Sequence, residues 1–333
     1  MRRTARTTVA GLVALATAAA AAGCSSTGSS AGSATNAAST TSRTALGSGC
    51  GRAPDPGPTA SAPFGDVVQS VTVAGTPRTY RLAVPATYRR DRPTPLVFDF
   101  HGSGSNAVQQ SAYTQLPAQG AAAGYLVVTP DAVAGTWDLA PPGSPTADQR
   151  YLSALESDLG ARYCIDARRI DAAGISLGSE FAAIVACDPA NHIAAIGLVA
   201  AEFLLRPCTG PVSVLAFHGT ADPIVAYAEG GVGRALPGVK VTGAVQNLAQ
   251  WARLDRCGPD PVVATATPGL ETRTWTGCAT GTSVVLHSLV GGGHTWPGSP
   301  VVLSAAAFGP STHVVSATHS MLVFFAAHPL ARR

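Results

Sequence analysis

Three short segments of the chain each contain one residue that can take part in nucleophilic catalysis. A serine hydroxyl becomes reactive when a histidine takes its proton and a carboxylate orients that histidine. The three segments are Gly174-Ile175-Ser176-Leu177-Gly178, His218-Gly219-Thr220-Ala221-Asp222 and Gly291-Gly292-Gly293-His294-Thr295-Trp296-Pro297-Gly298. Together they predict acyl transfer, with Ser176, Asp222 and His294 as the catalytic residues.

The order of the three residues along the chain carries information about the fold. Ser176 comes first, Asp222 second and His294 last. This is the order of the α/β-hydrolase fold, whereas chymotrypsin-like and subtilisin-like enzymes bring the same groups together in other orders. The sequence therefore predicts a secreted serine esterase with an α/β-hydrolase domain.

The surroundings of Ser176 distinguish it from a chance match. The pattern Gly-x-Ser-x-Gly also occurs at residues 28–32, but that segment has no strand-like residues before it and no helix-like residues after it. Ser176 follows strand-like residues at 169–173 and precedes helix-like residues at 180–184. A sharp strand-to-helix turn strains the backbone of the nucleophile and leaves no room for side chains beside it, which explains the two flanking glycines.

The acid and the base have comparable settings. Asp222 follows an expected strand at 212–217, two strands beyond the one that leads to the serine. Asp131 is the second candidate acid, although it precedes the serine and breaks the order. His294 lies after the last expected strand, in a glycine-rich loop that can bring its ring close to the serine. We expect His218 to brace the loop that carries the acid.

A second glycine-rich turn, His101-Gly102-Ser103-Gly104-Ser105, follows the expected strand at 96–100. Backbone N–H groups in such a turn form one half of the oxyanion hole in this fold, and the residue after the nucleophile supplies the other half. We therefore expect the backbone N–H groups of Ser103 and Leu177 to bind the oxyanion, and His101 to orient the turn. The mechanism needs no metal ion and no cofactor, so none is expected.

These motifs resemble those of the secreted poly(3-hydroxybutyrate) depolymerase and feruloyl or acetyl-xylan esterase group, above all in the Gly-Gly-Gly-His-Thr-Trp-Pro-Gly segment. Residues 163–166 and 275–278 are also similar, and the resemblance covers roughly residues 50–329. It implies an ester substrate: a polyester oligomer, a feruloylated or acetylated polysaccharide, or a small ester. The chain departs from this group at Gly178-Ser179-Glu180, where the group often has Gly-Gly.

Other functions remain open for the same residues. A serine peptidase or a thioesterase can use this triad on this fold, because the triad does not select the acyl bond. A non-catalytic envelope lipoprotein that binds glycans is a third alternative, although a binding protein has no need of all three catalytic groups.

Two tryptophans are expected to form walls of the substrate site. Trp296 lies two residues after His294, and its flat face suits an aromatic acyl group or a sugar. Trp137 lies in a Gly-Thr-Trp loop and is expected to form the opposite wall. A packed core aromatic is the alternative for each of them.

Composition and charge narrow the class of protein. Hydrophobic residues make up 46% of the 333 residues and charged residues 12%, so the chain can bury a large core. The net charge of +3 comes from Arg2, Arg3 and Arg6, and without these the remaining 19 basic residues balance 19 acidic ones. A near-neutral chain without a basic stripe argues against a nucleic-acid partner.

The N-terminus has the features of an export signal. Arginines precede an apolar run at 9–22 that is too short to span a bilayer, so we expect residues 1–23 to be a signal peptide. Cys24 follows a sequence similar to the bacterial lipobox and is the expected lipidation site, with free secretion as the alternative. Residues 24–49 are rich in small polar residues and are expected to form a flexible tether. The expected location is extracellular or in the cell envelope, with membrane contact only through the lipid.

The rest of the chain, residues 50–333, is expected to form a single α/β domain. Strand-like runs alternate with helical stretches, which favours a mostly parallel sheet covered by helices on both faces. The expected strands are 67–73, 79–84, 96–100, 126–129, 170–173, 193–200, 212–217 and 284–289. The expected helices are 106–123, 147–163, 180–186, 241–254 and 316–327.

Six cysteines remain once Cys24 is set aside, and an exported protein can join them in disulfides. Six cysteines can pair in 15 ways, so the count alone does not give the connectivity. The firmest pair closes a short loop just before the strand that leads to His294. The expected pairs are Cys257–Cys278, Cys187–Cys208 and Cys50–Cys164.

Overall fold

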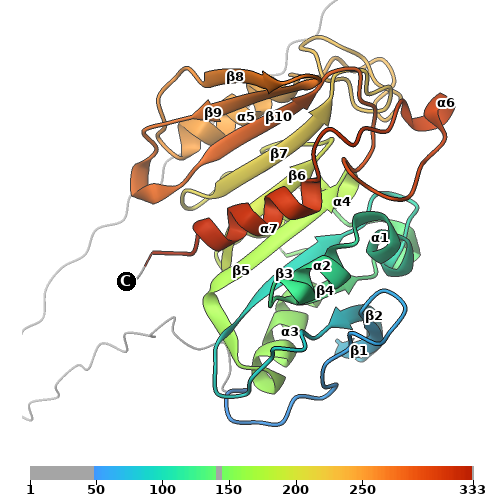
Figure 1. Ribbon diagram of the computed structural model, residues 1–333, viewed down its shortest axis with the longest axis vertical. Coiled ribbons are helices and arrows are strands. Elements are labelled where there is room, and N and C mark those ends of the chain that lie inside the picture. Colours follow the sequence, from blue (N-terminus) through green and yellow to red (C-terminus); the bar gives the residue numbers. More distant parts are fainter. Residues whose placement is uncertain (1–48, 140–144, 332–333) are drawn as a thin grey trace, which may run out of the picture. The chain divides into compact units, whose positions relative to one another are not determined.

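A ten-stranded sheet runs through the part of the chain that the computed structural model describes, residues 49–139 and 145–331. Its strand order is β1-β2-β4-β3-β5-β6-β7-β10-β9-β8 (Figure 1). The strands are β1 Val67–Val73, β2 Thr76–Ala83, β3 Thr94–Phe100, β4 Leu126–Pro130, β5 Ile165–Ile175, β6 Ile193–Val199, β7 Ser213–Gly219, β8 Val262–Thr267, β9 Leu270–Trp275 and β10 Val284–Leu289.

The six central strands, from β4 to β10 in the sheet order, are all parallel. At the two ends of the sheet, the β1–β2 and β8–β9 hairpins add antiparallel strands. Every residue of β3, β6 and β7 is buried, as expected for parallel strands covered on both faces. The predicted mostly parallel sheet is therefore confirmed.

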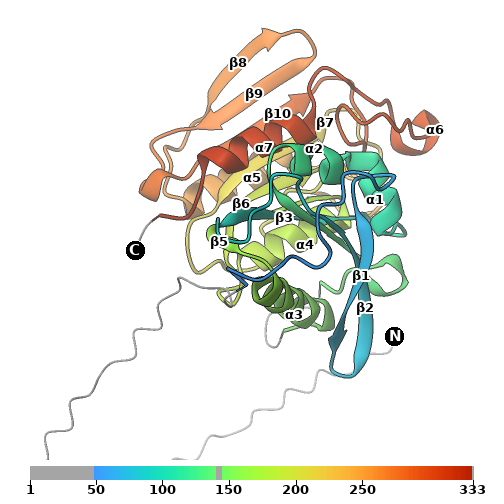
Figure 2. The ribbon, with the colours of Figure 1, turned by 60° about the horizontal axis from the view of Figure 1, so that its bottom comes forward.

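Helices cover both faces of the sheet (Figures 1 and 2). α3, α4 and α5 contribute to the core on one face, and α2 and α7 contribute to a second core on the other. Among the described residues, no helix combines the length and the apolar character needed to cross a membrane. The helices are α1 Ala107–Thr114, α2 Leu116–Ala122, α3 Ala147–Arg162, α4 Leu177–Ala186, α5 Ala244–Leu254, α6 Ala305–Phe308 and α7 Ala317–Ala327.

The structure corrects two expectations about the elements. The single helix expected at 106–123 is two helices, because Gln115 adopts a left-handed backbone conformation with φ 55° and ends α1. Pro117 then fits the first turn of α2, where its missing N–H has no intrahelical acceptor to lose.

The β8–β9 hairpin was not among the expected strands. All six residues of β8 are exposed, so its sequence does not show the alternation of a half-buried strand.

Within the described residues the structure has three disulfides, one across a sequence separation of 114 and two across a separation of 21. They are Cys50–Cys164, Cys187–Cys208 and Cys257–Cys278, which is the expected pairing. The first joins the start of the described chain to the residue before β5, and the second joins the end of α4 to the loop after β6.

Candidate active site

The candidate catalytic residues follow neighbouring parallel strands at the same edge of the sheet. Ser103 lies after β3, Ser176 after β5, Asp222 after β7 and His294 after β10. Because the carboxyl ends of parallel strands meet at one edge, segments that are distant along the chain come together there.

Ser176 forms the turn between β5 and α4. Its backbone has φ 55° and ψ −125°, a conformation that residues with a side chain rarely adopt. Two hydrogen bonds hold the turn: the Ser176 N–H donates to the carbonyl of Val199 at 2.9 Å, and the Ser176 carbonyl accepts from the N–H of Glu180 at 3.1 Å. The side chain is therefore presented on a strained turn at the end of a buried strand.

The two glycines of the motif are required by close backbone packing. A Cβ atom at Gly174 would lie 2.3 Å from the carbonyl oxygen of Gly178. A Cβ atom at Gly178 would lie 2.2 Å from the carbonyl oxygen of Phe100 in β3. Both distances are far below van der Waals contact with atoms that cannot rotate away, so no other residue fits this turn.

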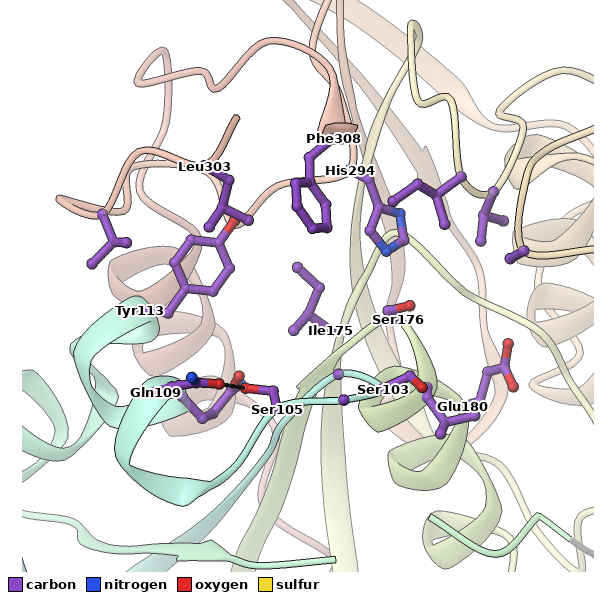
Figure 3. A pocket seen from close by; sticks show the side chains of 18 of the residues that line it. Ser103, Ser105, Gln109, Tyr113, Ile175, Ser176, Glu180, His294, Leu303 and Phe308 are labelled. Carbon is purple, nitrogen blue, oxygen red and sulfur yellow. Dashed lines mark hydrogen bonds between the residues drawn. The ribbon is translucent and has the colours of Figure 1, made fainter. Parts of the chain in front are cut away.

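His294 lies between Asp222 and Ser176. Its Nδ1 is 2.7 Å from Oδ2 of Asp222, and its ring points toward the side chain of Ser176 (Figure 3). The N–H groups of Gly293 and His294 donate to the carbonyls of Pro310 and Phe308, which fixes the loop. A hydrogen bond to Nδ1 leaves Nε2 as the atom able to accept a proton from the serine.

A second buried histidine shares the Asp222 carboxylate. Nε2 of His218 lies 3.3 Å from Oδ2 of Asp222 and 3.0 Å from the carbonyl of Val225. Its Nδ1 lies 2.6 Å from Oε1 of Glu202, which the sequence analysis did not identify. Burial lowers the pKa of His218. The charge of Glu202 and the contact with Asp222 raise it by more than burial lowers it, so the resulting pKa is about 10. His218 therefore carries a positive charge at neutral pH.

Glu202 could have been found from the sequence in one way: it is a single charged residue that follows the fully buried strand β6.

Asp222 is held in its ionised form. Its Oδ1 accepts the backbone N–H groups of Ile224 at 2.7 Å and Val225 at 2.9 Å. Burial raises the pKa of this carboxyl, but the hydrogen bonds and charges of His218 and His294 lower it well below its ordinary value. A permanently ionised carboxylate is what a histidine base needs as its partner.

Asp131, the alternative acid, has a different role. Its Oδ1 accepts the N–H of Ala107 at 2.7 Å, and its Oδ2 accepts the hydroxyl of Thr79 at 3.0 Å. It therefore binds the first N–H of α1 and a residue of β2, while Asp222 holds His294.

The expected oxyanion donors lie next to the serine. Ser103 and Leu177 line the same cavity as Ser176. The N–H groups of Gly104 and Ser105 donate to carbonyls of Gly135 and Gly102, but within the described chain the N–H of Ser103 has no acceptor. Leu177 is the first residue of α4, where backbone N–H groups have no acceptor inside the helix. In the described chain, two backbone N–H groups without an acceptor thus belong to residues that line the same cavity as Ser176.

His101 supports this turn, as expected. Its ring accepts the N–H of Ala132 through Nε2 at 3.1 Å, and Nδ1 lies 2.8 Å from the carbonyl of Gly102. Burial lowers the pKa of His101, so the ring is neutral at neutral pH and suits the role of a structural hydrogen-bonding group.

The serine opens into a cavity of about 1050 Å³ with a mostly apolar lining. Tyr113, Leu303 and Phe308 form a group of apolar side chains on one side of Ser176 (Figure 3). The carboxyl group of Glu180 lies on the other side. A cavity of this size holds a drug-sized organic molecule.

The structure contradicts the prediction that Trp137 and Trp296 form the substrate walls. Trp137 is 2% exposed, stacks on Phe181 with ring centroids 4.7 Å apart, and donates Nε1–H to the carbonyl of His101 at 2.8 Å. Trp296 is 1% exposed and donates Nε1–H to the hydroxyl of Thr318 at 2.9 Å. Both are core residues, and neither lines the cavity.

The aromatic side chains that do line the cavity come from other segments, at Tyr113, Phe203 and Phe308. No sequence motif marks these residues, and their approach to Ser176 depends on how distant loops pack. Cys24, the expected lipidation site, lies outside the described residues.

Comparisons with known proteins identify relatives among esterases. No protein-family profile matches the chain. Feruloyl esterase B of Piromyces equi is 27% identical over 223 residues, which cover 63% of this chain and 41% of that protein. NocK of Nocardia uniformis subsp. tsuyamanensis, a proposed esterase, is 27% identical over 280 residues, which cover 77% of this chain and 81% of that protein. Thus the chain spans less than half the length of the Piromyces relative but most of the Nocardia one.

The fold has a solved counterpart in an acetyl xylan esterase from Aspergillus awamori. The two structures superimpose with a TM-score of 0.54 over 78% of this chain and 99% of that one, at 15% identity. The chain therefore has the α/β-hydrolase fold, and its homologues include feruloyl and acetylxylan esterases. Both results agree with the resemblance found in the sequence.

Proposed function

We propose that this protein is a serine esterase that hydrolyses carboxylic esters with Ser176 as nucleophile, His294 as base and Asp222 as the orienting acid. The observation that carries this proposal is the chain of contacts from acid to base to nucleophile: the His294 ring is bonded to Asp222 and directed at Ser176, a serine on a strained turn that lines the same cavity as His294. The esterases among the homologues support it.

The first half of the reaction forms an acyl-enzyme. His294 Nε2 takes the proton of the Ser176 hydroxyl while the oxygen attacks the ester carbonyl carbon. The carbonyl oxygen becomes an oxyanion, which the backbone N–H groups of Ser103 and Leu177 stabilise. Loss of one such donor typically raises the barrier by ~3 kcal/mol. The bond to the alcohol oxygen then breaks, and the alcohol leaves with the proton from His294.

The second half releases the acid. Water enters, His294 removes one of its protons, and the resulting hydroxide attacks the acyl carbon. The bond to Ser176 breaks, and the serine oxygen recovers the proton from His294. Asp222 stays ionised throughout and stabilises the imidazolium that forms in each half.

The substrates we propose are feruloylated or acetylated polysaccharides, polyester oligomers or small esters. The apolar cavity suits the organic part of such an ester. A peptidase or thioesterase activity uses the same groups, but the known relatives favour oxygen esters.

Hydrolysis of short-chain p-nitrophenyl esters tests this proposal. We expect the purified protein to release p-nitrophenol and Ser176→Ala to lose the activity, while Ser153→Ala, a change of the same kind on α3, retains it. A fluorophosphonate probe should label Ser176, as read by mass spectrometry of the digested protein. Equal hydrolysis by Ser176→Ala would reject the esterase site, and labelling of another serine would reject the choice of nucleophile.

We also propose that the protein is exported and anchored by a lipid on Cys24. Its three disulfides fit an extracellular location. The mass of the mature N-terminus distinguishes an acylated Cys24 from ordinary cleavage, and Cys24→Ala should release the protein into the medium. An unmodified N-terminus at another residue would favour free secretion.

A further inference from the structure

Glu180 places a carboxyl group in the wall of the candidate active site. It lies in the first turn of α4, four residues after Ser176, and lines the same cavity. Figure 3 shows its side chain near Ser103 and Ser176, away from Tyr113 and Leu303. The cavity is thus divided around the nucleophile into an apolar side and a side with one acidic group.

This carboxyl group has no partner within the described chain: no hydrogen-bond donor and no basic side chain contacts it. The two other acidic residues of the site, Asp222 and Glu202, are both bound to histidines. Burial raises the pKa of Glu180 to about 7, so a large share of the protein carries an unpaired charge here at neutral pH. A half-buried charge without a hydrogen bond is unfavourable, and a donor from a ligand would relieve that penalty.

We propose that Glu180 determines substrate specificity: its carboxylate accepts a hydrogen bond from a hydroxyl group of an uncharged substrate and repels a substrate that carries a carboxylate near the ester. As a statement about the rates of hydrolysis of different esters, this inference rests on the proposed ester hydrolysis. The substrate class is a neutral ester with an apolar group on the side of Tyr113, Leu303 and Phe308 and a hydroxyl group on the opposite side of Ser176.

A purely structural role for Glu180 has different consequences. A carboxylate in the first turn of a helix interacts favourably with the helix dipole. In that case removal of the charge lowers the stability of the protein but leaves the ratio of its activities on charged and neutral substrates unchanged.

The kinetic test compares butyrate esters that differ only in the end of the alcohol: a methyl group, a hydroxyl group or a carboxylate. A second series carries the same groups at the end of the acyl chain, since the ester can bind in either direction. For Glu180→Gln, which keeps an acceptor and removes the charge, we expect the ratio of kcat/KM for anionic over neutral esters to rise roughly 10- to 100-fold. For Glu180→Met, which removes the acceptor as well, the advantage of the hydroxyl ester over the methyl ester should fall roughly tenfold.

Asp260→Asn is the matched control, because it removes one negative charge from an exposed residue that does not line the cavity. It should leave both ratios unchanged. Thermal unfolding of each variant verifies that it is folded. If both ratios in Glu180→Gln and Glu180→Met equal those of the wild type in both series, the proposal is wrong.

A binding measurement separates this inference from the proposed function. In a Ser176→Ala background, calorimetry compares the affinities for 4-phenylbutanol and 4-phenylbutyrate with and without Glu180→Gln. Weaker discrimination between the two ligands after Glu180→Gln supports the role of Glu180, even if the wild type hydrolyses no ester and the proposed function fails. Unchanged discrimination contradicts the role of Glu180, even if the esterase activity is real.

Discussion

Asp222 interacts with two histidines that differ in charge and in role. His294 faces the serine and alternates between neutral and charged forms in the proposed reaction. His218 faces Glu202 and stays charged, because burial is outweighed by the nearby carboxylates. Both histidines contact Oδ2 of Asp222, at 3.3 Å for His218 and 2.7 Å for His294, while Oδ1 accepts two backbone N–H groups, so the carboxylate is held in place for His294.

Substitution of the acid should reduce turnover far more than substrate affinity. In Asp222→Asn the amide favours the wrong tautomer of His294, and we expect kcat to fall by about 10⁴-fold with little change in KM. Steady-state kinetics on a p-nitrophenyl ester measures both constants. Asp131→Asn is the matched control and should retain most of the activity, because Asp131 binds α1 and β2. A larger loss in Asp131→Asn than in Asp222→Asn would exchange the roles of the two acids.

The pair of His218 and Glu202 should make stability depend on pH. The pKa of His218 is raised in the folded protein from 6.5 to about 10, so its contribution to stability is complete below pH 6.5 and is lost as the pH rises toward 10. Within that window the free energy of unfolding falls as the pH rises, because the folded state retains a proton that the unfolded state releases.

Glu202→Gln removes the largest of the interactions that raise the pKa of His218 against the effect of burial, so the dependence of stability on pH should weaken between pH 7 and 9. Urea unfolding at several pH values measures it, with Glu229→Gln, an exposed carboxylate outside the site, as control. An identical slope in Glu202→Gln and the wild type would mean that His218 is neutral.

At the scale of the elements, the junction of β5 and α4 is the least tolerant part of the site. Alanine is normally the better helix residue by about 1 kcal/mol. In Gly178→Ala, however, the added Cβ meets the backbone of β3 at 2.2 Å. We expect this variant to lose about 3 kcal/mol or more of stability, together with its esterase activity.

Gly210→Ala is the control for this prediction, since a Cβ there meets nothing within 4 Å and its φ is not positive. It should change stability by less than about 0.5 kcal/mol. Urea denaturation compares the two variants. Equal stabilities would mean that the turn can open to accept a side chain.

At the scale of the whole molecule, the sheet brings the site together and the disulfides restrain its surroundings. Cys50–Cys164 closes a loop with a sequence separation of 114, and Cys257–Cys278 closes one with a separation of 21. In the chain-entropy account a longer loop stabilises more, with about 5 kcal/mol for the first and about 3 kcal/mol for the second. The double alanine variants of the two pairs should therefore rank in that order in urea unfolding. The reverse order would mean that strain or local packing dominates.

The parallel sheet was predictable because each of its buried strands can be identified from a short segment of the sequence. Buried strands such as β6 and β7 appear as continuous apolar runs between turn residues. The split between α1 and α2 was not predictable in the same way, because either a continuous helix or a break at Gln115 satisfies the local pattern. The exposed strand β8 is stabilised by pairing with β9. Because all its residues are exposed, its own sequence has no hydrophobic periodicity from which this pairing could be predicted.

The sequence by itself determined the fold class, the order of Ser176, Asp222 and His294, and the glycines that let a serine occupy a strained turn. These features depend on residue types and short spacings, which are visible without coordinates. Only the tertiary structure decided that Trp137 and Trp296 are core residues, that Glu202 holds His218, and that Glu180 faces the cavity. The physical reason is that the direction of a side chain and the identity of its neighbours are set by packing between segments that lie far apart in the sequence.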